Sequence, residues 1–308
     1  MVSWDSLVVA FLNSSKIILL SQPGKHYRLL VNGVALTTRF KHPGFPRYPD
    51  KSMPLGRYIE VLQKLINLGK TVVITTNYAL ISDKAVQWIN DRRLGLPQGI
   101  GPPKDLRRFQ YGFKVSAVWT SDIQQGTNFD EEYFRNPLWL ENKELVQIYK
   151  LHGGSNWVYC DNCSDQRELH LSRTFNDVKK IFSIKENPTC CKCGTSYEYS
   201  IVPPMTNKNI DSDLVLKTVW SKAREALLNS THIIFIGYSL PNADPKVIDL
   251  IKSTRSLNRK YYLIMEKNHE VISRYERLLG ENLVKTFNSG YSSSNLFQIY
   301  EQINAETT

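Results

Sequence analysis

Short apolar runs alternate with helical stretches through much of this chain. Four runs have the length and β-branched or aromatic content of buried strands, at residues 71–76, 146–151, 232–236 and 261–265. Apolar residues at helical spacing predict helices over 58–66, from Ser82 onward, over 213–229, from Pro245 onward, over 269–279 and over 295–306. Strands that alternate with such helices predict βαβ units and a parallel sheet. Residues 94–145, with scattered Gly and Pro, are predicted to form loops and short elements.

The carboxyl ends of the predicted strands are the places where a parallel α/β sheet binds its ligands. Asn77, His152 and Gly237 lie at three of these ends and are therefore candidate site residues. A helix start follows the third strand, because Asp244 can cap a helix whose first residue is Pro245.

Four of the five cysteines form two pairs. In each pair two residues separate the cysteines: Cys160 from Cys163, and Cys190 from Cys193. That spacing lets both thiolates of a pair reach one tetrahedral ion, and two such pairs complete a closed structural zinc site. Unrelated cytosolic thiols, or a redox pair, are the alternatives. The sequence thus predicts a small four-cysteine zinc-ribbon insert over residues 157–200, with Cys191 as a free thiol.

The composition is that of a folded protein with a basic surface. The chain has 308 residues, 42% of them apolar, a formal net charge of +10 and a sequence pI of about 9.2. This balance favours anionic partners, but the basic residues are spread out and no nucleic-acid motif accompanies them. The apolar stretch at 7–20 is interrupted by polar residues at 13–16, so we predict no signal peptide, no membrane span and a cytoplasmic location.

Four segments, in order along the chain, resemble segments of the sirtuin-like (silent-information-regulator-like) NAD-binding family. They are TTNYA at 75–79, KLHGGSNW at 150–157, the cysteine module followed by IVPPMTNK at 201–208, and IGYSLPNAD at 236–244. The similar segments of the family are KLHGSLNW and IVPPTWNK, together with TTNYD and GYSLPPTD of its prokaryotic branch. Each motif is weak alone, but all four in this order around a cysteine module are specific.

The resemblance implies a doubly wound, Rossmann-like α/β sheet that binds NAD, together with a structural zinc ion. It divides the chain into an NAD-binding domain over 1–156 and 201–308 and the zinc-binding insert over 157–200. The implied function is hydrolysis of the nicotinamide–ribose bond of NAD, as in relatives that act in anti-phage defence. Two alternatives stay open: a non-catalytic nucleotide-sensing or protein-interaction module, with a protein partner or as a homo-oligomer, and an NAD-dependent protein deacylase.

The resemblance also implies roles for individual residues. His152 corresponds to the catalytic histidine, and Asn77 to the asparagine that places the attacking water or the ribose. The remaining cofactor-binding positions are Thr75, Thr76, Tyr78, Gly237, Ser239 and Asp244. For Asp244, the helix cap described above is at least as good an explanation. Independently of the resemblance, a histidine handles protons near neutral pH and a neutral amide can hold water, which suits this chemistry.

The chain departs from the family pattern in two places. The family opens with a strand and a Gly-Ala-Gly loop that cradles the pyrophosphate, and we find no such segment before Gly33. The opening SWDSL resembles what usually follows that loop, which predicts a shortened or degenerate member of the family. Ala79 also replaces an aspartate that contacts the nicotinamide amide. Both departures predict weak NAD binding and slow turnover.

Overall fold

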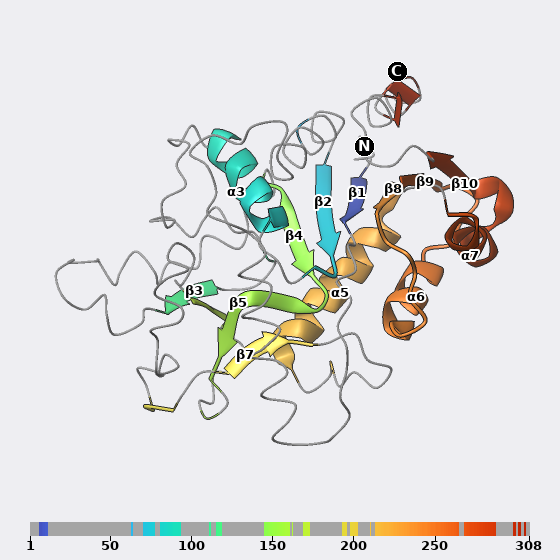
Figure 1. Ribbon diagram of the computed structural model, residues 1–308. Coiled ribbons are helices and arrows are strands. Elements are labelled where there is room, and N and C mark those ends of the chain that lie inside the picture. Colours follow the sequence, from blue (N-terminus) through green and yellow to red (C-terminus); the bar gives the residue numbers. More distant parts are fainter. Residues whose placement is uncertain are drawn as a thin grey trace.

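The computed structural model describes residues 6–11, 63, 70–77, 81–93, 111, 115–118, 145–160, 162, 169–172, 193–195, 198–202, 210, 213–264, 268–287, 298–299, 301–302 and 305. These residues form two sheets and the helices that accompany them (Figure 1). The helices predicted over 58–66 and 295–306 lie largely outside the described residues.

The larger sheet has six strands, each parallel to its neighbours. They are β1 (Ser6–Phe11), β2 (Lys70–Thr75), β4 (Gln147–Lys150), β8 (Ser230–Ile236), β9 (Lys260–Ile264) and β10 (Val284–Phe287). Their order across the sheet is β10-β9-β8-β1-β2-β4. The chain therefore winds outward from β1 on one side, returns to the centre, and winds outward again from β8. This is the strand order of a dinucleotide-binding Rossmann sheet, so the fold is a Rossmann-like α/β fold.

The first strand, β1, was not among the strands predicted from the sequence. Residues 6–11 form β1, which lies at the centre of the sheet between β2 and β8. The expectation that no strand opens the sheet is therefore wrong, because the segment SLVVAF forms its central strand. No glycine lies between Phe11 and Gly24 in the sequence, and the residues that follow Phe11 lie outside the described part of the chain.

The four strands predicted from apolar runs are confirmed as β2, β4, β8 and β9, with ends shifted by one or two residues. The strand β10 had no counterpart among the predicted strands. It is only 4 residues long, and Lys285 and Thr286 interrupt its apolar pattern. Residues 284–287 form a strand because they pair with β9, and the local sequence does not reveal this pairing.

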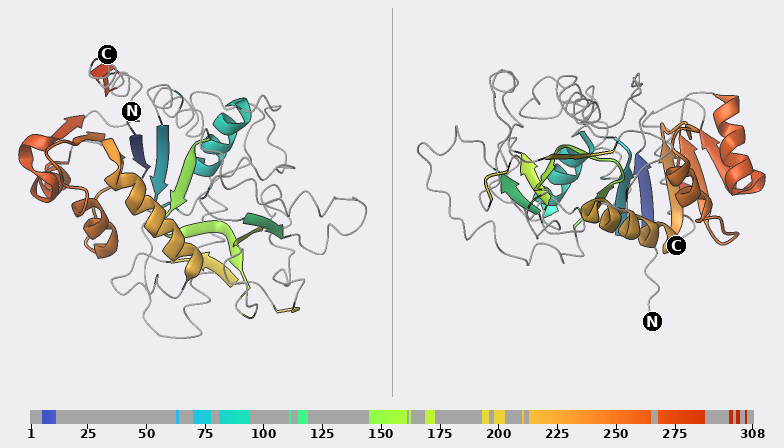
Figure 2. Two further views of the ribbon diagram at one scale, coloured as in Figure 1. Left: turned by 180° about the vertical axis from the view of Figure 1, so that it is seen from behind. Right: turned by 90° about the horizontal axis from the view of Figure 1, so that it is seen from below.

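The described helices are α3 (Ile81–Arg93), α5 (Leu214–Leu228), α6 (Pro245–Lys252) and α7 (His269–Leu279), with a short 3₁₀ turn η6 (Glu281–Leu283). The bounds of α7 agree with prediction, and those of α5 lie one residue inside the predicted range at each end. The side chains of Asp213 and Asn268 cap the first turns of these helices. The helix predicted from Ser82 onward is α3, which begins one residue earlier, at Ile81. Helix α5 runs across one face of the larger sheet, behind it in Figure 1 and in front of it in the reverse view of Figure 2.

The smaller sheet has the order β3-β6-β5-β7. Its strands are β3 (Val115–Val118), β6 (Leu169–Ser172), β5 (Gly153–Tyr159) and β7 (Glu198–Ile201). Strand β5 begins directly after His152, so the predicted insert boundary at residue 157 falls within it. The division of the chain into an NAD-binding domain and an insert stays a prediction.

The core of the larger sheet is built from the apolar strand residues together with one face of α5. Val73, Ile148 and Ile234 are fully buried, as are Leu216 and Val219 of α5. Among the described helices, none combines the length and apolar character required to cross a bilayer.

Candidate functional site

One row of register-paired residues crosses all six strands at the carboxyl edge of the larger sheet. From β10 to β4 the row consists of Phe287, Ile264, Ile236, Phe11, Thr75 and Lys150. Asn77 and His152 each lie two residues beyond this row, and Gly237 lies one residue beyond it. All three candidates therefore lie at the edge where sheets of this kind bind their ligands.

His152 is buried and lies against Asp244. Nε2 of His152 is 2.9 Å from Oδ2 of Asp244, and the two side chains are 3% and 2% exposed. His152 follows β4, whereas Asp244 follows β8 and directly precedes α6. Since β1 and β2 lie between β4 and β8, the pair joins the two halves of the doubly wound sheet across its carboxyl edge.

The predicted helix-capping role of Asp244 is correct for its backbone and wrong for its side chain. Asp244 precedes Pro245, and its carbonyl accepts the Ile248 N–H at 3.2 Å, but its carboxylate makes no capping hydrogen bond. The carboxylate is directed to His152 instead. A buried carboxylate must be paired, and the histidine supplies that partner.

Two tyrosines hold the segment that carries Asp244. The Tyr238 hydroxyl is 3.5 Å from Asp244 Oδ2, to which it donates, and the Tyr275 hydroxyl of α7 donates to the Tyr238 carbonyl at 3.1 Å. Burial raises the pKa of Tyr238, and the neighbouring Asp244 carboxylate raises it further. Burial also raises the pKa of Tyr275 well above its ordinary value. Both hydroxyls therefore stay protonated near neutral pH and act as donors.

The two threonines before Asn77 are buried, and Thr75 stabilises the turn that carries Asn77. Thr75 is fully buried, and its Oγ1 accepts the Asn77 backbone N–H at 3.0 Å, which shapes the turn after β2. Its carbonyl accepts the Leu151 N–H at 2.9 Å, so the ladder to β4 continues up to the residue before His152. Thr76 is 7% exposed and Asn77 is partly exposed. Tyr78, another predicted contact, lies outside the described residues.

The loop after β8 supplies the exposed part of the edge. Gly237 is exposed and has a φ of +67°, a conformation that favours glycine, and its N–H donates to the Ile264 carbonyl at 3.0 Å. Ser239 is partly buried, and its carbonyl accepts a hydrogen bond from Arg274 of α7 at 3.3 Å. The structure thus places Gly237 and Ser239 on the same loop as Asp244.

A buried charged cluster beneath the site was not assigned a role from the sequence. Lys150 Nζ is 2.6 Å from Asp83 Oδ2, both side chains are fully buried, and the Tyr111 hydroxyl donates to Asp83 Oδ1 at 2.6 Å. Burial lowers the pKa of Lys150, and the Asp83 carboxylate opposes that shift. Burial and Asp83 both raise the pKa of Tyr111. A lysine inside the apolar run VQIYKL was the sequence signal for such a pair, because a buried lysine requires a counter-charge.

Two of the four predicted zinc ligands can be placed. Cys160, buried at the end of β5, and Cys193, exposed in a turn, have Sγ atoms 3.4 Å apart. Gly194, directly after Cys193, has a φ of +70°, a turn conformation that favours glycine. Cys163 and Cys190 lie outside the described residues. In the part of the chain that the structure describes, no group of three or more potential metal ligands occurs.

The His152–Asp244 pair gives this edge a group that can move protons. When Nε2 carries its proton toward a carboxylate, Nδ1 is the acceptor nitrogen of the imidazole. The carboxylate also stabilises the imidazolium that forms on protonation and fixes the orientation of the ring. Fold and site together define a Rossmann-like α/β protein with a buried histidine–aspartate pair at the ligand-binding edge of its parallel sheet.

Comparison with known proteins gives structural neighbours only. No protein-family model matches the chain, and no curated protein matches it. Among solved structures it is similar to a mutant Sir2 homologue in complex with ADP-ribose, with 12% identity, a TM-score of 0.49, and 99% of this chain and 94% of that chain covered. It is also similar to a Sir2 homologue–NAD complex, with 12% identity, a TM-score of 0.43, and coverage of 99% and 91%. The strand order of the larger sheet defines the Rossmann-like fold independently of these matches.

Proposed function

We propose that the chain binds NAD at the carboxyl edge of the larger sheet and hydrolyses its nicotinamide–ribose bond. The observation that carries the proposal is the buried His152–Asp244 pair, which spans the edge of a sheet with the Rossmann strand order. Dinucleotides bind such sheets where the strand order reverses, which here is between β1 and β8. The resemblance of the TTNYA, KLHGGSNW and IGYSLPNAD segments to those of NAD-cleaving sirtuin-like proteins supports the same function.

The proposed roles follow from the chemistry of the residues. Cleavage of the nicotinamide bond leaves an electron-poor ribose carbon. The site therefore requires a group that transfers protons and a neutral polar group that holds the attacking water without itself reacting with that carbon. His152 would transfer the proton, with Asp244 holding its ring and its charge. Asn77 carries a neutral amide at the same edge, suited to holding water. Gly237 leaves the loop after β8 without a side chain where the dinucleotide would approach.

The test of this function is nicotinamide release at saturating NAD. General acid–base groups contribute about 10²- to 10⁴-fold, so His152→Asn should lower kcat by at least about 10²-fold. His232→Asn is the matched control: His232 is also buried but lies near the amino end of β8, and its variant should stay within about twofold of the unmodified chain. An unmodified chain that binds NAD but releases no nicotinamide would favour a nucleotide sensor. Release that depends on an added acetyl-lysine peptide would favour a deacylase.

We also propose that this hydrolase acts in anti-phage defence. The support is the resemblance of TTNYA and KLHGGSNW to the prokaryotic branch of the sirtuin-like family. Cells that express the unmodified chain should lose NAD on phage infection and plate phage less efficiently than cells with His152→Asn. Equal plating with both chains, against a panel of unrelated phages, would count against the defence role alone.

We propose a structural zinc ion bound by Cys160, Cys163, Cys190 and Cys193. The contact between Cys160 and Cys193 supports it, because it brings one cysteine of each pair together from segments 33 residues apart. Four thiolates around a tetrahedral zinc ion lie roughly 3.8 Å from one another, close to the 3.4 Å between these sulfurs. A disulfide would require about 2.0 Å.

Metal analysis of the purified protein tests the zinc proposal. We expect about one zinc ion per chain, retained in Cys191→Ser and lost in Cys193→Ser. Stably folded protein without bound metal, or retention of the full zinc content by Cys193→Ser, would overturn this ligand set.

A further inference from the structure

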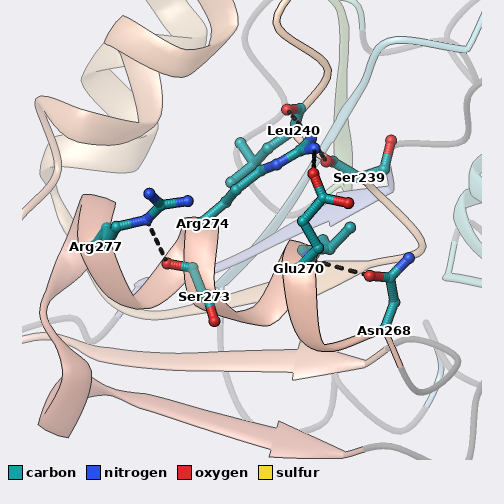
Figure 3. Close-up of polar contacts among 8 residues, drawn as sticks. Ser239, Leu240, Asn268, Glu270, Ser273, Arg274 and Arg277 are labelled. Carbon is teal, nitrogen blue, oxygen red and sulfur yellow. Dashed lines mark hydrogen bonds and ion pairs between the residues drawn. The ribbon is translucent and has the colours of Figure 1, made fainter.

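Helix α7 contacts the loop after β8 through two adjacent residues. Arg274 Nη1 donates to the carbonyls of Ser239 and Leu240, each at 3.3 Å, and Figure 3 shows its guanidinium directed at both. The hydroxyl of the next residue, Tyr275, donates to the Tyr238 carbonyl at 3.1 Å. Three consecutive carbonyls of the loop are therefore held by one helix.

The helix itself is firmly placed. Val271, Tyr275 and Leu279 recur every fourth residue and are buried, which fixes α7 against the core. At its start, the Asn268 side chain caps the helix by accepting the Val271 N–H. Glu270, one turn before Arg274, pairs with the Arg274 guanidinium and orients it.

The segment that α7 holds is strained. Leu240 has a φ of +49°, although it carries a side chain, and it is 2% exposed. A residue other than glycine occupies this region only when its surroundings enforce it. The carbonyls of Ser239 and Leu240, on the two sides of the strained dihedral, are the groups that Arg274 binds.

The same loop leads directly to the His152–Asp244 pair. After Leu240 the chain turns at Pro241, whose carbonyl accepts the Asp244 N–H at 2.9 Å, and the Asp244 carboxylate then meets His152. The Tyr238 carbonyl accepts the hydrogen bond from Tyr275, and the Tyr238 hydroxyl is 3.5 Å from the Asp244 carboxylate. The position of Asp244 thus depends on the loop conformation that α7 enforces.

We propose that Arg274 is a positioning residue of the site: by binding the Ser239 and Leu240 carbonyls, it holds the loop in the conformation that sets Asp244 against His152. The contacts of Arg274 with the loop are made to these two backbone carbonyls. The link to catalysis rests on the function proposed above, whereas the link to the His152–Asp244 geometry does not.

Arg274→Gln tests the proposal, with Arg277→Gln as the matched control. Arg277 lies three residues further along the same helix. Its Nε donates to the Ser273 carbonyl within the helix at 3.2 Å, and its side chain is directed away from the loop (Figure 3). Two readouts are needed: the ¹⁵N chemical shifts of the His152 ring, assigned with His152→Asn, and kcat and KM for nicotinamide release.

We expect Arg274→Gln to shift the His152 ring signals toward those of a histidine without a carboxylate partner, and to lower kcat roughly 10- to 100-fold. Arg277→Gln should change neither. If Arg274→Gln does not fold, Glu270→Gln, which alters an exposed residue, should produce the same shifts at smaller amplitude. Unchanged His152 signals in the folded variants would overturn the proposal, whatever happens to kcat. A chain that releases no nicotinamide at all would refute the proposed function, and the ring signals would still decide the role of Arg274.

Discussion

Replacing Lys150 by Met should destabilise the protein strongly while the paired replacement restores it. Lys150 and Asp83 are fully buried and their charged atoms are 2.6 Å apart. Without the lysine, the Asp83 carboxylate would stay charged in the core, where the Tyr111 hydroxyl donates a hydrogen bond to it. Breaking one side of a buried ion pair costs about 3–5 kcal/mol, mostly because the other charge stays buried.

The double variant Lys150→Met/Asp83→Asn separates this cause from a loss of packing. Asparagine keeps an acceptor for Tyr111 and carries no charge, and methionine fills most of the space of the lysine chain. Since apolar or neutral replacements of both partners are often nearly neutral, the double variant should recover most of the lost free energy of unfolding. It should also recover activity, because the cluster ties the first turn of α3 to the end of β4, two residues before His152.

Urea unfolding at 25 °C measures these differences, provided the m-value is unchanged. Lys252→Met, at an exposed position in the last turn of α6, is the control and should stay within about 0.5 kcal/mol. A cost below about 1 kcal/mol for Lys150→Met would show that the pair is not a buried charge pair. A double variant less stable than either single variant would show the same.

Three further outcomes follow from the geometry. Asp244→Asn should keep the fold but lower kcat about 10²-fold, because His152 loses the charge that stabilises its protonated ring; a loss below threefold would refute this role. Buried Tyr275 has a raised pKa, so its stabilising contribution is present below about pH 10 and is lost above it as the unfolded chain ionises, at up to about 1.4 kcal/mol per pH unit. The urea midpoint of Tyr275→Phe should therefore fall less steeply above about pH 10 than that of the unmodified chain. An equal fall would contradict the raised pKa of Tyr275. Lys150, whose lowered pKa also makes stability depend on pH, is present in both chains, so its effect cancels in the comparison. Gly237→Ala should cost about 1–2 kcal/mol from its positive φ alone, since an added Cβ meets nothing within 4 Å; a neutral result in urea unfolding would mean that the loop relaxes.

Most of the sheet could be predicted from sequence because its strands are continuous apolar runs followed by capped helices. Asp213 and Asn268 signal the starts of α5 and α7 with their own side chains. Strand β1 was not recognised, because no predicted helix follows its short apolar run and its partners, β2 and β8, are distant in sequence. Only the pairing identifies it as the central strand.

The candidate site was predictable in its location and less so in its contacts. Asn77 and His152 follow strands, and a parallel sheet brings such strand ends to one edge. The pairing of His152 with Asp244 could not be predicted, because it depends on a strained loop at Leu240 that leads the chain away from the capping geometry. Arg274 was missed because it lies on the polar side of an amphipathic helix, where sequence alone gives an arginine no particular partner.

Hydrogen–deuterium exchange with a non-hydrolysable NAD analogue tests most directly whether NAD binds across the carboxyl edge of the parallel sheet, as proposed. At saturating analogue, peptides that contain Asn77, His152 and the loop over 237–244 should become protected. Peptides at the amino ends of β8 and β9, around Ser230 and Lys260, should exchange as before. Protection that appears only at the amino ends, or no protection at any concentration of the analogue, would contradict the account.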